Sequence, residues 1–341
     1  MTRVAAIDCG TNTIRLLIAE ADRDQMGRPR LEVLRRRNEI VRLGQGVDRT
    51  GVLDPEALER TLTVVAAYAA DCAELDVAPG AAARRFVATS ATRDARNRED
   101  FVAGVRRLLG IAPEVVSGQE EARLSFSGSL LGAREGAGGG AQGERAQAPR
   151  LIVDLGGGST ELVLGVDAPS AAISLDTGSV RITERFLTGG VTTEAETAAR
   201  AEVRGLLDGA ERVVDLSAPG QLVGLAGTIT TVTAHALGLQ AFDPQALGGA
   251  ELSPQAVLAS CEAIVHSTAE QRASWGYLAP GRRDVIAAGA LVWSEVVSRV
   301  VERTTAAGRP LERVITSLYD ILDGIALSLV PTQRPAEGAG A

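Results

Sequence analysis

The feature that most constrains the fold is a pattern that occurs twice along the chain. Each copy consists of a short apolar strand, an aspartate followed by a glycine turn, and a second apolar strand. The first copy centres on Asp8 to Thr13 and the second on Asp154 to Glu161. Repetition of a whole structural unit is typical of duplicated domains. The chain is therefore predicted to fold into two similar domains that face one another across a cleft.

The segments around these two copies alternate between strand and helix patterns. Asp54 and Pro55 begin a helix whose apolar residues recur at helical spacing. Further helices are expected over about 94–109 and 193–216. Strands alternating with helices predict an α/β fold. We place the first domain at 1–125 with a returning C-terminal helix at 316–330, the second domain at 126–315, a flexible glycine-rich loop at 133–149, and a disordered tail at 331–341.

Charge and composition exclude several classes of protein. The formal net charge is -8 and the pI is about 5.1, which argues against a nucleic-acid or membrane-surface binder. The chain has no lysine, so any anion must be held by arginines or backbone groups. Three scattered cysteines and the lack of an apolar stretch of signal-peptide or membrane-spanning length predict a cytoplasmic protein. His235 and His266 have no partner at the spacing of a metal site or catalytic triad.

The two glycine turns have the chemistry expected of a phosphate site. A dinucleotide-binding turn would lead into a helix and a P-loop would need a lysine, so both motifs are excluded. What remains is a tight hairpin whose backbone N–H groups can approach phosphate oxygens. A hairpin turn with no ligand is the alternative, but two such turns, each opening one half, favour phosphate binding. The phosphate-binding positions would be Gly10 and Thr11 in the first turn, and Gly156, Gly157, Gly158 and Ser159 in the second.

Acidic residues accompany both turns. Asp8, Asp154 and Glu161 would supply the carboxylate oxygens that Mg²⁺ uses when it bridges protein and phosphate. For Asp8, a side chain that merely stabilises the turn is the alternative interpretation.

Two further residues stay open from the sequence alone. Glu121 follows a turn that opens a helix, so it could be a general base or could simply complement the helix dipole. Arg93 belongs to a group of arginines between 84 and 98 that could form a phosphate groove or a solvated face.

Seven segments together resemble the exopolyphosphatase and guanosine pentaphosphate phosphatase family. They follow the family order over nearly the whole chain. They are DCGTNTIRLLIAE at 8–20, RLGQGVDRTGVL at 42–53, ATSATRDARN at 88–97, SGQEEARLSF at 117–126, VDLGGGSTELVL at 153–164, GSVRITERF at 178–186 and LAGTITTVTA at 225–234. The resemblance implies two actin-like, ribonuclease H-like domains of the ASKHA superfamily.

The resemblance also implies roles for individual residues. Glu121 matches the family's catalytic base. Thr11, Asn12 and Arg93 match its binders of the terminal phosphate. Asp154 and Glu161 match magnesium-linked carboxylates, and the phosphate loops correspond to Gly156 to Ser159 together with Gly227 and Thr228.

The activity implied is magnesium-dependent removal of the terminal phosphate from inorganic polyphosphate. Short chains are the expected substrate, because the helical domains that follow in longer family members are missing here. Guanosine pentaphosphate phosphatase and a non-hydrolysing alarmone sensor are the alternatives, and a homodimer is a possible assembly.

One segment near the C-terminus departs from the family pattern. The family commonly shows Ser-x-Tyr-Gly-Leu-Arg-Glu-Gly, whereas this chain has Asp320, Leu322 and Asp323 at the Gly, Arg and Glu positions. The departure puts the usual ion pairing near the interdomain hinge in doubt.

Overall fold

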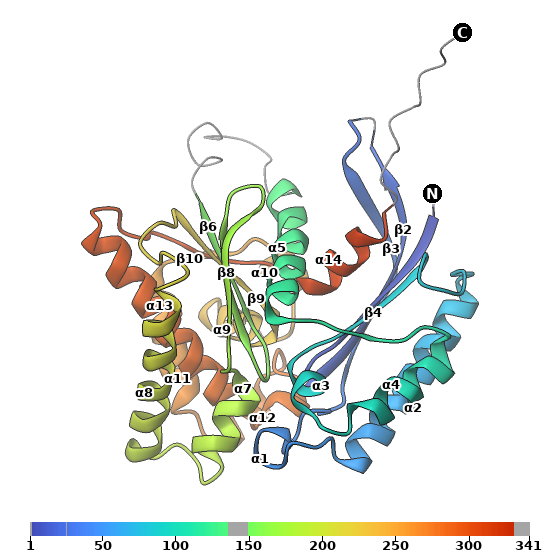
Figure 1. Ribbon diagram of the computed structural model, residues 1–341. Helices are drawn as coiled ribbons and strands as arrows, with labels where there is room; N and C mark the ends of the chain where they lie inside the picture. The colour runs from blue at the N-terminus through green and yellow to red at the C-terminus, as the bar shows by residue number, and fades with distance from the viewer. Residues whose placement is uncertain (1, 25, 136–148, 331–341) are drawn as a thin grey trace.

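Two β-sheets lie side by side, with helices on their outer faces and two further helices between them (Figure 1). The computed structural model describes residues 2–24, 26–135 and 149–330. Most of the expected glycine-rich loop and all of the expected tail after residue 330 therefore lie outside the described residues. Among the residues described, no helix is long and apolar enough to cross a membrane.

The first sheet has the strand order β3-β2-β1-β4-β5. The first three strands form an antiparallel meander, and β4 and β5 extend the sheet in parallel from β1. Val4 to Ile7 are fully buried, as expected for a central strand covered on both faces. The strand bounds are β1 Thr2–Cys9, β2 Thr13–Arg23, β3 Pro29–Ile40, β4 Arg84–Ala88 and β5 Glu114–Val115.

Helices α2 and α4 cover the outer face of the first sheet, where Tyr68, Phe86 and Phe101 are buried. The helix at Asp54 begins as predicted, because the Asp54 carboxylate accepts hydrogen bonds from the first helical turn. The helix expected over 94–109 ends at Leu109 as predicted but begins only at Arg98, and a separate short helix ends at Asp94. Asn97 separates them by exchanging hydrogen bonds with the Leu53 backbone. The helices are α1 Val47–Thr50, α2 Pro55–Glu74, α3 Ser90–Asp94 and α4 Arg98–Leu109.

The second sheet has the strand order β10-β11-β9-β6-β7-β8. Strands β6, β7 and β8 form an antiparallel meander like that of the first sheet, and β9 and β11 extend it in parallel from β6. The strand bounds are β6 Arg150–Leu155, β7 Thr160–Gly165, β8 Pro169–Leu175, β9 Gln221–Leu225, β10 Glu251–Leu252 and β11 Val314–Thr316.

The outer face of the second sheet packs against a large apolar core formed with α8, α9, α11 and α13. The helix expected over 193–216 ends at Ala210. The chain continues as a turn, from which Val214 and Leu216 still pack in this core. The helical segments are α7 Ser179–Ile182, a π-helical turn Thr183–Leu187, α8 Thr193–Ala210, α9 Ala226–Ala236, α10 Pro244–Leu247, α11 Pro254–Val265, α12 Ala269–Ser274, a 3₁₀ turn Pro280–Arg282 and α13 Ile286–Ala306.

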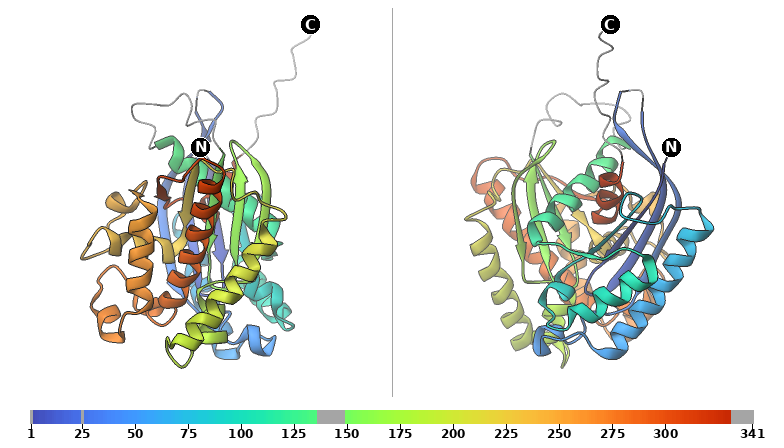
Figure 2. Two further views of the ribbon diagram at one scale, coloured as in Figure 1. Left: turned by 90° about the vertical axis from the view of Figure 1, so that its left-hand side faces the viewer. Right: turned by 45° about the vertical axis from the view of Figure 1, so that its right-hand side comes forward.

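Two helices fill the space between the sheets, α5 (Gly118–Glu135) and α14 (Ile321–Ser328) (Figures 1 and 2). They touch backbone to backbone: a Cβ on Gly128 would lie 1.8 Å from the Asp320 carbonyl oxygen, and one on Gly324 would lie 2.0 Å from that of Leu124. Helix α5 runs through Glu135, so the beginning of the loop expected at 133–149 is helical.

The alternation of side chains along the strands decides which residues reach this middle layer. On β1, Ala6 packs with α14 while its neighbours Ala5 and Ile7 face α2 and α4. On β6, Ile152 packs with Phe126 of α5. Residues two positions further along each strand share that inner face.

Candidate active site

Asp8 and Asp154 occupy matching positions on the inner faces of the two sheets. Each lies two residues after an inner-face apolar residue of its strand, and each pairs across an antiparallel ladder with a charged residue: Asp8 with Arg15, and Asp154 with Glu161. The next strand adds Ser174 opposite Glu161. The repeated strand–turn–strand pattern therefore places two pairs of ionisable side chains in the middle layer.

The first turn of α5 brings Glu121 to the same place. Gly118 lies so close to β8 that a Cβ there would be 2.4 Å from the Ser174 Cβ. Glu121 is buried, and its carboxylate lies 3.4 Å from Arg93. Arg93 also donates a 2.8 Å hydrogen bond to the Val116 carbonyl, which fixes the guanidinium beside Glu121.

Burial, with the charge of neighbouring carboxylates, raises the pKa of four acidic side chains here, Asp8, Asp154, Glu161 and Glu121. Burial raises the pKa of Glu121 well above its usual range, and the nearby Glu161 raises it further. Burial, reinforced by Asp154, raises the pKa of Glu161 to about 8. Burial and then the charge of Asp320 raise the pKa of Asp154 to about 6, and burial also raises the pKa of Asp8. Clustered carboxylates whose pKa values rise through burial and mutual repulsion require a compensating cation when ionised.

The donor chemistry of this cluster fits a magnesium ion. One oxygen of Asp154 accepts a 2.6 Å hydrogen bond from Ser125, and one oxygen of Glu161 accepts a 2.7 Å bond from Ser174. These hydroxyls orient the two carboxylates. All the donors are oxygens, as Mg²⁺ prefers.

The two glycine turns lie against each other at the junction of the sheets. A Cβ on Gly158 would be 2.5 Å from both the Thr11 and the Ser90 hydroxyl oxygens, so only glycine fits there. Thr11 and Ser90 share a 2.8 Å hydrogen bond. The cavity between the two halves at this point has a volume of about 20 Å³, enough for one water molecule. The two halves are thus in direct contact at this point of the expected cleft.

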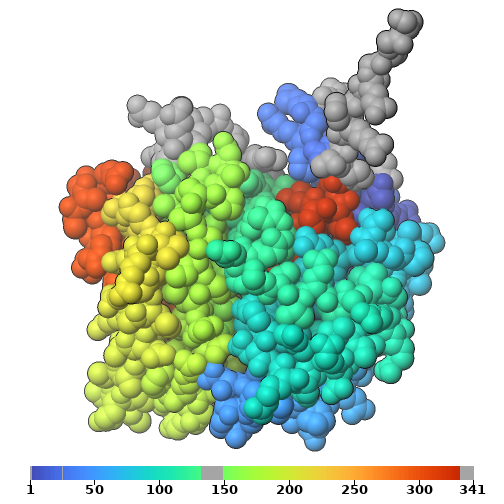
Figure 3. All heavy atoms as spheres, viewed as in Figure 1, coloured from blue at the N-terminus to red at the C-terminus, as the bar shows by residue number. Residues whose placement is uncertain are grey.

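Ion pairs hold this junction closed. Arg181 of α7 donates to the Gly158 carbonyl at 2.8 Å and to Asp94 at 2.8 Å, and it also pairs with Asp48. Glu184 accepts a 2.8 Å hydrogen bond from the Gly46 N–H. The two halves accordingly meet in continuous contact on the face shown in Figure 3.

Gly227 and Thr228 begin α9 in the second half. Ala226, just before them, has a φ of 73°, a left-handed backbone that L residues rarely adopt. The guanidinium of Arg282 covers Gly227, where a Cβ would lie 1.0 Å from its nitrogen. Thr228 packs against Gly289, which also neighbours Ser179, and the Ser179 N–H donates to the Gly156 carbonyl at 3.0 Å. The start of α9 therefore adjoins the second glycine turn.

The first turn is held by its own backbone. The Gly10 N–H donates to the Thr13 carbonyl, and the Asn12 carbonyl accepts from Val41 and Arg42. The second turn repeats this arrangement, with the Gly156 N–H donating to the Ser159 carbonyl at 3.0 Å.

The other arginines of the 84–98 group have structural partners away from this junction. Arg84 donates to backbone carbonyls, Arg85 pairs with Glu114, and Arg96 donates to the Thr50 carbonyl. Arg93 alone of these lies beside Glu121, so the group does not form a continuous groove.

Two residues at the junction, Arg15 and Arg282, were missed by the sequence analysis. Arg15 donates twice to Asp8, at 2.7 and 3.0 Å, and pairs with Asp320 at the start of α14. The side chain of Arg282 has no hydrogen bond or ion pair within the described part of the chain, and its pKa is lowered to about 10, mainly by burial. Only Arg15 had a signal in the sequence, since a hairpin centred on the first turn places it opposite Asp8.

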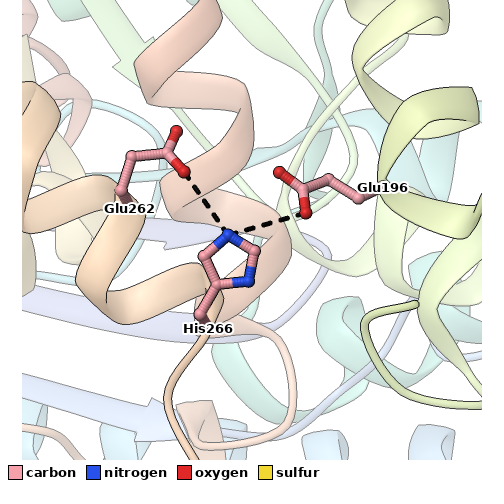
Figure 4. A group of neighbouring side chains, drawn as sticks. All are labelled: Glu196, Glu262 and His266. Carbon is pink, nitrogen blue, oxygen red and sulfur yellow. Dashed lines mark ion pairs between the residues drawn. The ribbon is translucent and has the colours of Figure 1, made fainter. Parts of the chain in front are cut away.

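The structure gives His266 two acidic neighbours that its sequence spacing did not indicate. Its Nε2 lies 3.6 Å from Glu196 and 3.5 Å from Glu262 (Figure 4). The ligand atoms of these three residues all lie within 4.8 Å of one another. However, Arg200 pairs with both glutamates, at 2.8 and 2.6 Å, so their charge is already compensated.

Comparison with known proteins gives a consistent result. Residues 17–307 match the Ppx/GppA phosphatase family. The chain is 44% identical over 337 residues to exopolyphosphatase 2 of Mycobacterium tuberculosis, covering 96% of this chain and 99% of that protein.

Two solved structures share the architecture. One, described as an exopolyphosphatase-like protein, has a TM-score of 0.84 and 40% identity over 96% of this chain and 98% of that one. The other, the Aquifex aeolicus member of the Ppx/GppA family, has a TM-score of 0.72 and 27% identity over 96% and 97%. The predicted α/β fold with two halves is confirmed, and the chain belongs to the Ppx/GppA phosphatase family.

Proposed function

We propose that this protein is an exopolyphosphatase that hydrolyses the terminal phosphate from inorganic polyphosphate with the help of Mg²⁺. The observation that carries this proposal is the buried Glu121 carboxylate, which lies beside Arg93 and near the carboxylates of Glu161, Asp154 and Asp8. The relative with 44% identity over 96% of this chain is itself named an exopolyphosphatase.

In the proposed mechanism Glu121 accepts a proton from a water molecule that attacks the terminal phosphorus. The bond from that phosphorus to the bridging oxygen breaks, and the shortened polyphosphate leaves with the electron pair on that oxygen. A carboxylate with a raised pKa suits this role, because a general base works best when its pKa is near the working pH. Arg93 would bind the terminal phosphate from beside Glu121, together with Thr11 and Asn12. A guanidinium fork is suited to phosphate oxygens.

The remaining phosphates of the chain would bind along the second half. Backbone N–H groups of Gly157 to Ser159 can donate once the turns separate, and Gly227 and Thr228 offer further donors at the N-terminus of α9. The N–H groups of Gly10 and Gly156 already donate within their own turns, so these two glycines would serve by letting the phosphates approach the backbone closely. Their role is to hold the charge that develops on the phosphoryl oxygens. Because the junction is closed, substrate entry requires the two halves to move apart.

Asp154 and Glu161 would hold the magnesium ion, with Asp8 as a further carboxylate beside it. When bound, the ion supplies charge neutralisation for the phosphate chain and its transition state. Asp8 is the least available of the three, since one of its oxygens accepts both hydrogen bonds from Arg15.

A guanosine pentaphosphate phosphatase is the second candidate, because it would cleave the same kind of terminal anhydride. No contact among the described residues favours a guanosine over a phosphate chain. A sensor without hydrolysis would be favoured by loss of Glu121 or Asp154, and both are present. We place the protein in the cytoplasm, since its cysteines are free and buried, as in a reducing compartment.

The test is phosphate release from tripolyphosphate, long polyphosphate, guanosine pentaphosphate and ATP, measured in parallel with Mg²⁺ present. We expect polyphosphate to be cleaved faster than either nucleotide. Faster cleavage of guanosine pentaphosphate would replace the proposal by the second candidate.

The variant Glu121→Gln tests the mechanism, with Glu120→Gln as the matched control. Glu121→Gln should lower turnover by about 10²- to 10⁴-fold while substrate binding changes little. Glu120→Gln makes the same charge change on the same helical turn. The Glu120 carboxylate, however, lies 2.7 Å from the Arg123 guanidinium on the surface. If Glu120→Gln loses activity and Glu121→Gln keeps it, the assignment of the base is wrong.

A further inference from the structure

Asp320 lies at the start of α14, in contact with α5 and with Arg15 of β2. It precedes α14, where its side chain accepts a 2.9 Å hydrogen bond from the Leu322 N–H and so caps the helix. Its carbonyl oxygen lies against Gly128 of α5, where no side chain would fit. Asp320 is buried, and its position is fixed by backbone contacts on both sides.

The Asp320 carboxylate reaches Asp8 through Arg15. Arg15 pairs with Asp320 through one guanidinium nitrogen and with Asp8 through the other two donors, at 2.7 and 3.0 Å. The side chains of Asp8 and Asp320 are 5% and 9% exposed, so this chain of ion pairs is shielded from solvent. Within the described residues, Arg15 is the only cation that either carboxylate contacts.

Charge in this group is unbalanced in a way that suits a divalent cation. Of the charged residues that act on Asp154, Asp320 has the largest effect, ahead of Arg15 and Asp8. Three carboxylates, Asp8, Asp154 and Asp320, and one guanidinium, Arg15, leave a formal charge of −2 when all are ionised. Arg282 also interacts electrostatically with Asp320, but its guanidinium lies over Gly227 and forms no ion pair with Asp320 among the described residues.

We propose that Asp320 is a positioning residue of this active site, which holds Arg15 against Asp8 and supplies negative charge that a divalent cation at Asp154 requires. This inference rests on the proposed function for the presence of the cation. The family pattern has glycine at this position, so the role would belong to this chain and to relatives that share the aspartate.

The test compares Mn²⁺ binding by the full chain and by Asp320→Asn, measured from the free Mn²⁺ signal in electron paramagnetic resonance. Asparagine can still cap α14, but it carries no charge. We expect the Mn²⁺ dissociation constant to rise by about tenfold, as expected for one charge lost beside a divalent ion. The Mg²⁺ concentration needed for half-maximal phosphate release should rise in parallel.

Asp323→Asn is the matched control. Asp323 lies on the same first turn of α14, is also buried, and pairs with Arg36 of β3. It accepts a 3.0 Å hydrogen bond from the Asp320 N–H, which the side-chain oxygen of asparagine can keep. We expect its loss to leave Mn²⁺ affinity within twofold of the wild type.

Three outcomes would overturn the inference: no Mn²⁺ binding by the wild type, unchanged affinity in Asp320→Asn, or equal losses in both variants. The last would indicate a general effect of α14. Should the wild type release no phosphate from polyphosphate while Asp320→Asn still weakens Mn²⁺ binding, the proposed function fails and the inference stands.

Discussion

Replacing Asp154 by asparagine should stabilise the metal-free protein increasingly as the pH rises. Burial and Asp320 raise the pKa of Asp154 from 3.8 to about 6, so the folded protein keeps a proton there that the unfolded chain releases. Stability from such a group is present below the unfolded pKa and is lost as the pH rises through the folded pKa. The asparagine variant has no proton to lose at this position.

The size of the effect follows from the shift. A change from 3.8 to about 6 is about 2 pKa units, or roughly 3 kcal/mol at 1.36 kcal/mol per unit. The difference in unfolding free energy between variant and wild type should therefore move by roughly this amount, in favour of the variant, between pH 4 and pH 8. Taking the difference between variant and wild type cancels the contributions of surface carboxylates to the unfolding free energy. One of these is Asp48, whose pKa is lowered mainly by Arg185.

The assay is urea unfolding with a chelator at several pH values, repeated with excess Mg²⁺. The ion should stabilise the wild type most at high pH and the variant little, because binding to the folded state alone adds stability. A difference that does not change with pH would show that Asp154 is not a destabilised buried carboxylate. A change in the opposite direction would refute the reasoning about its environment altogether.

Two further predictions follow from the closed junction and from the backbone at the second phosphate loop. Arg181→Gln removes the contacts to Asp48, Asp94 and the Gly158 carbonyl. The substrate-free protein should therefore open, and its radius of gyration from small-angle X-ray scattering should increase. An unchanged radius would mean that these ion pairs do not hold the halves together. Ala226→Gly should raise the unfolding free energy by about 1 kcal/mol in thermal unfolding, because glycine adopts the left-handed φ of 73° without strain, and a loss of stability would contradict this.

The sequence allowed good prediction of features that depend on neighbouring residues. The two turns follow from short apolar strands ending in an aspartate and glycines, and the structure gives each the same backbone closure. The start of α2 was predictable because Asp54 caps it locally. The domain boundaries and the individual site roles stay predictions.

Features that depend on long-range packing could not be predicted. The contact between Arg15 and Asp320 joins residues 305 positions apart, and nothing near either residue indicates the other. Similarly, His266 meets Glu196 only because α8 and α11 pack in one core. Nothing in the sequence around Arg282 indicates its position, since its place over Gly227 arises from the turn before α13.

The departure at positions 320 and 323 shows how a local pattern and a distant partner combine. Read alone, two aspartates in place of glycine and glutamate suggest a lost ion pair at the hinge. In the folded chain each aspartate has an arginine on the first sheet, Arg15 for Asp320 and Arg36 for Asp323. Alternation along β2 places Arg15 on the inner face with Leu17, where α14 lies, so an acid at position 320 meets a cation already facing it. The altered segment thus changes which residues pair at the junction, and it adds a buried carboxylate beside Asp154.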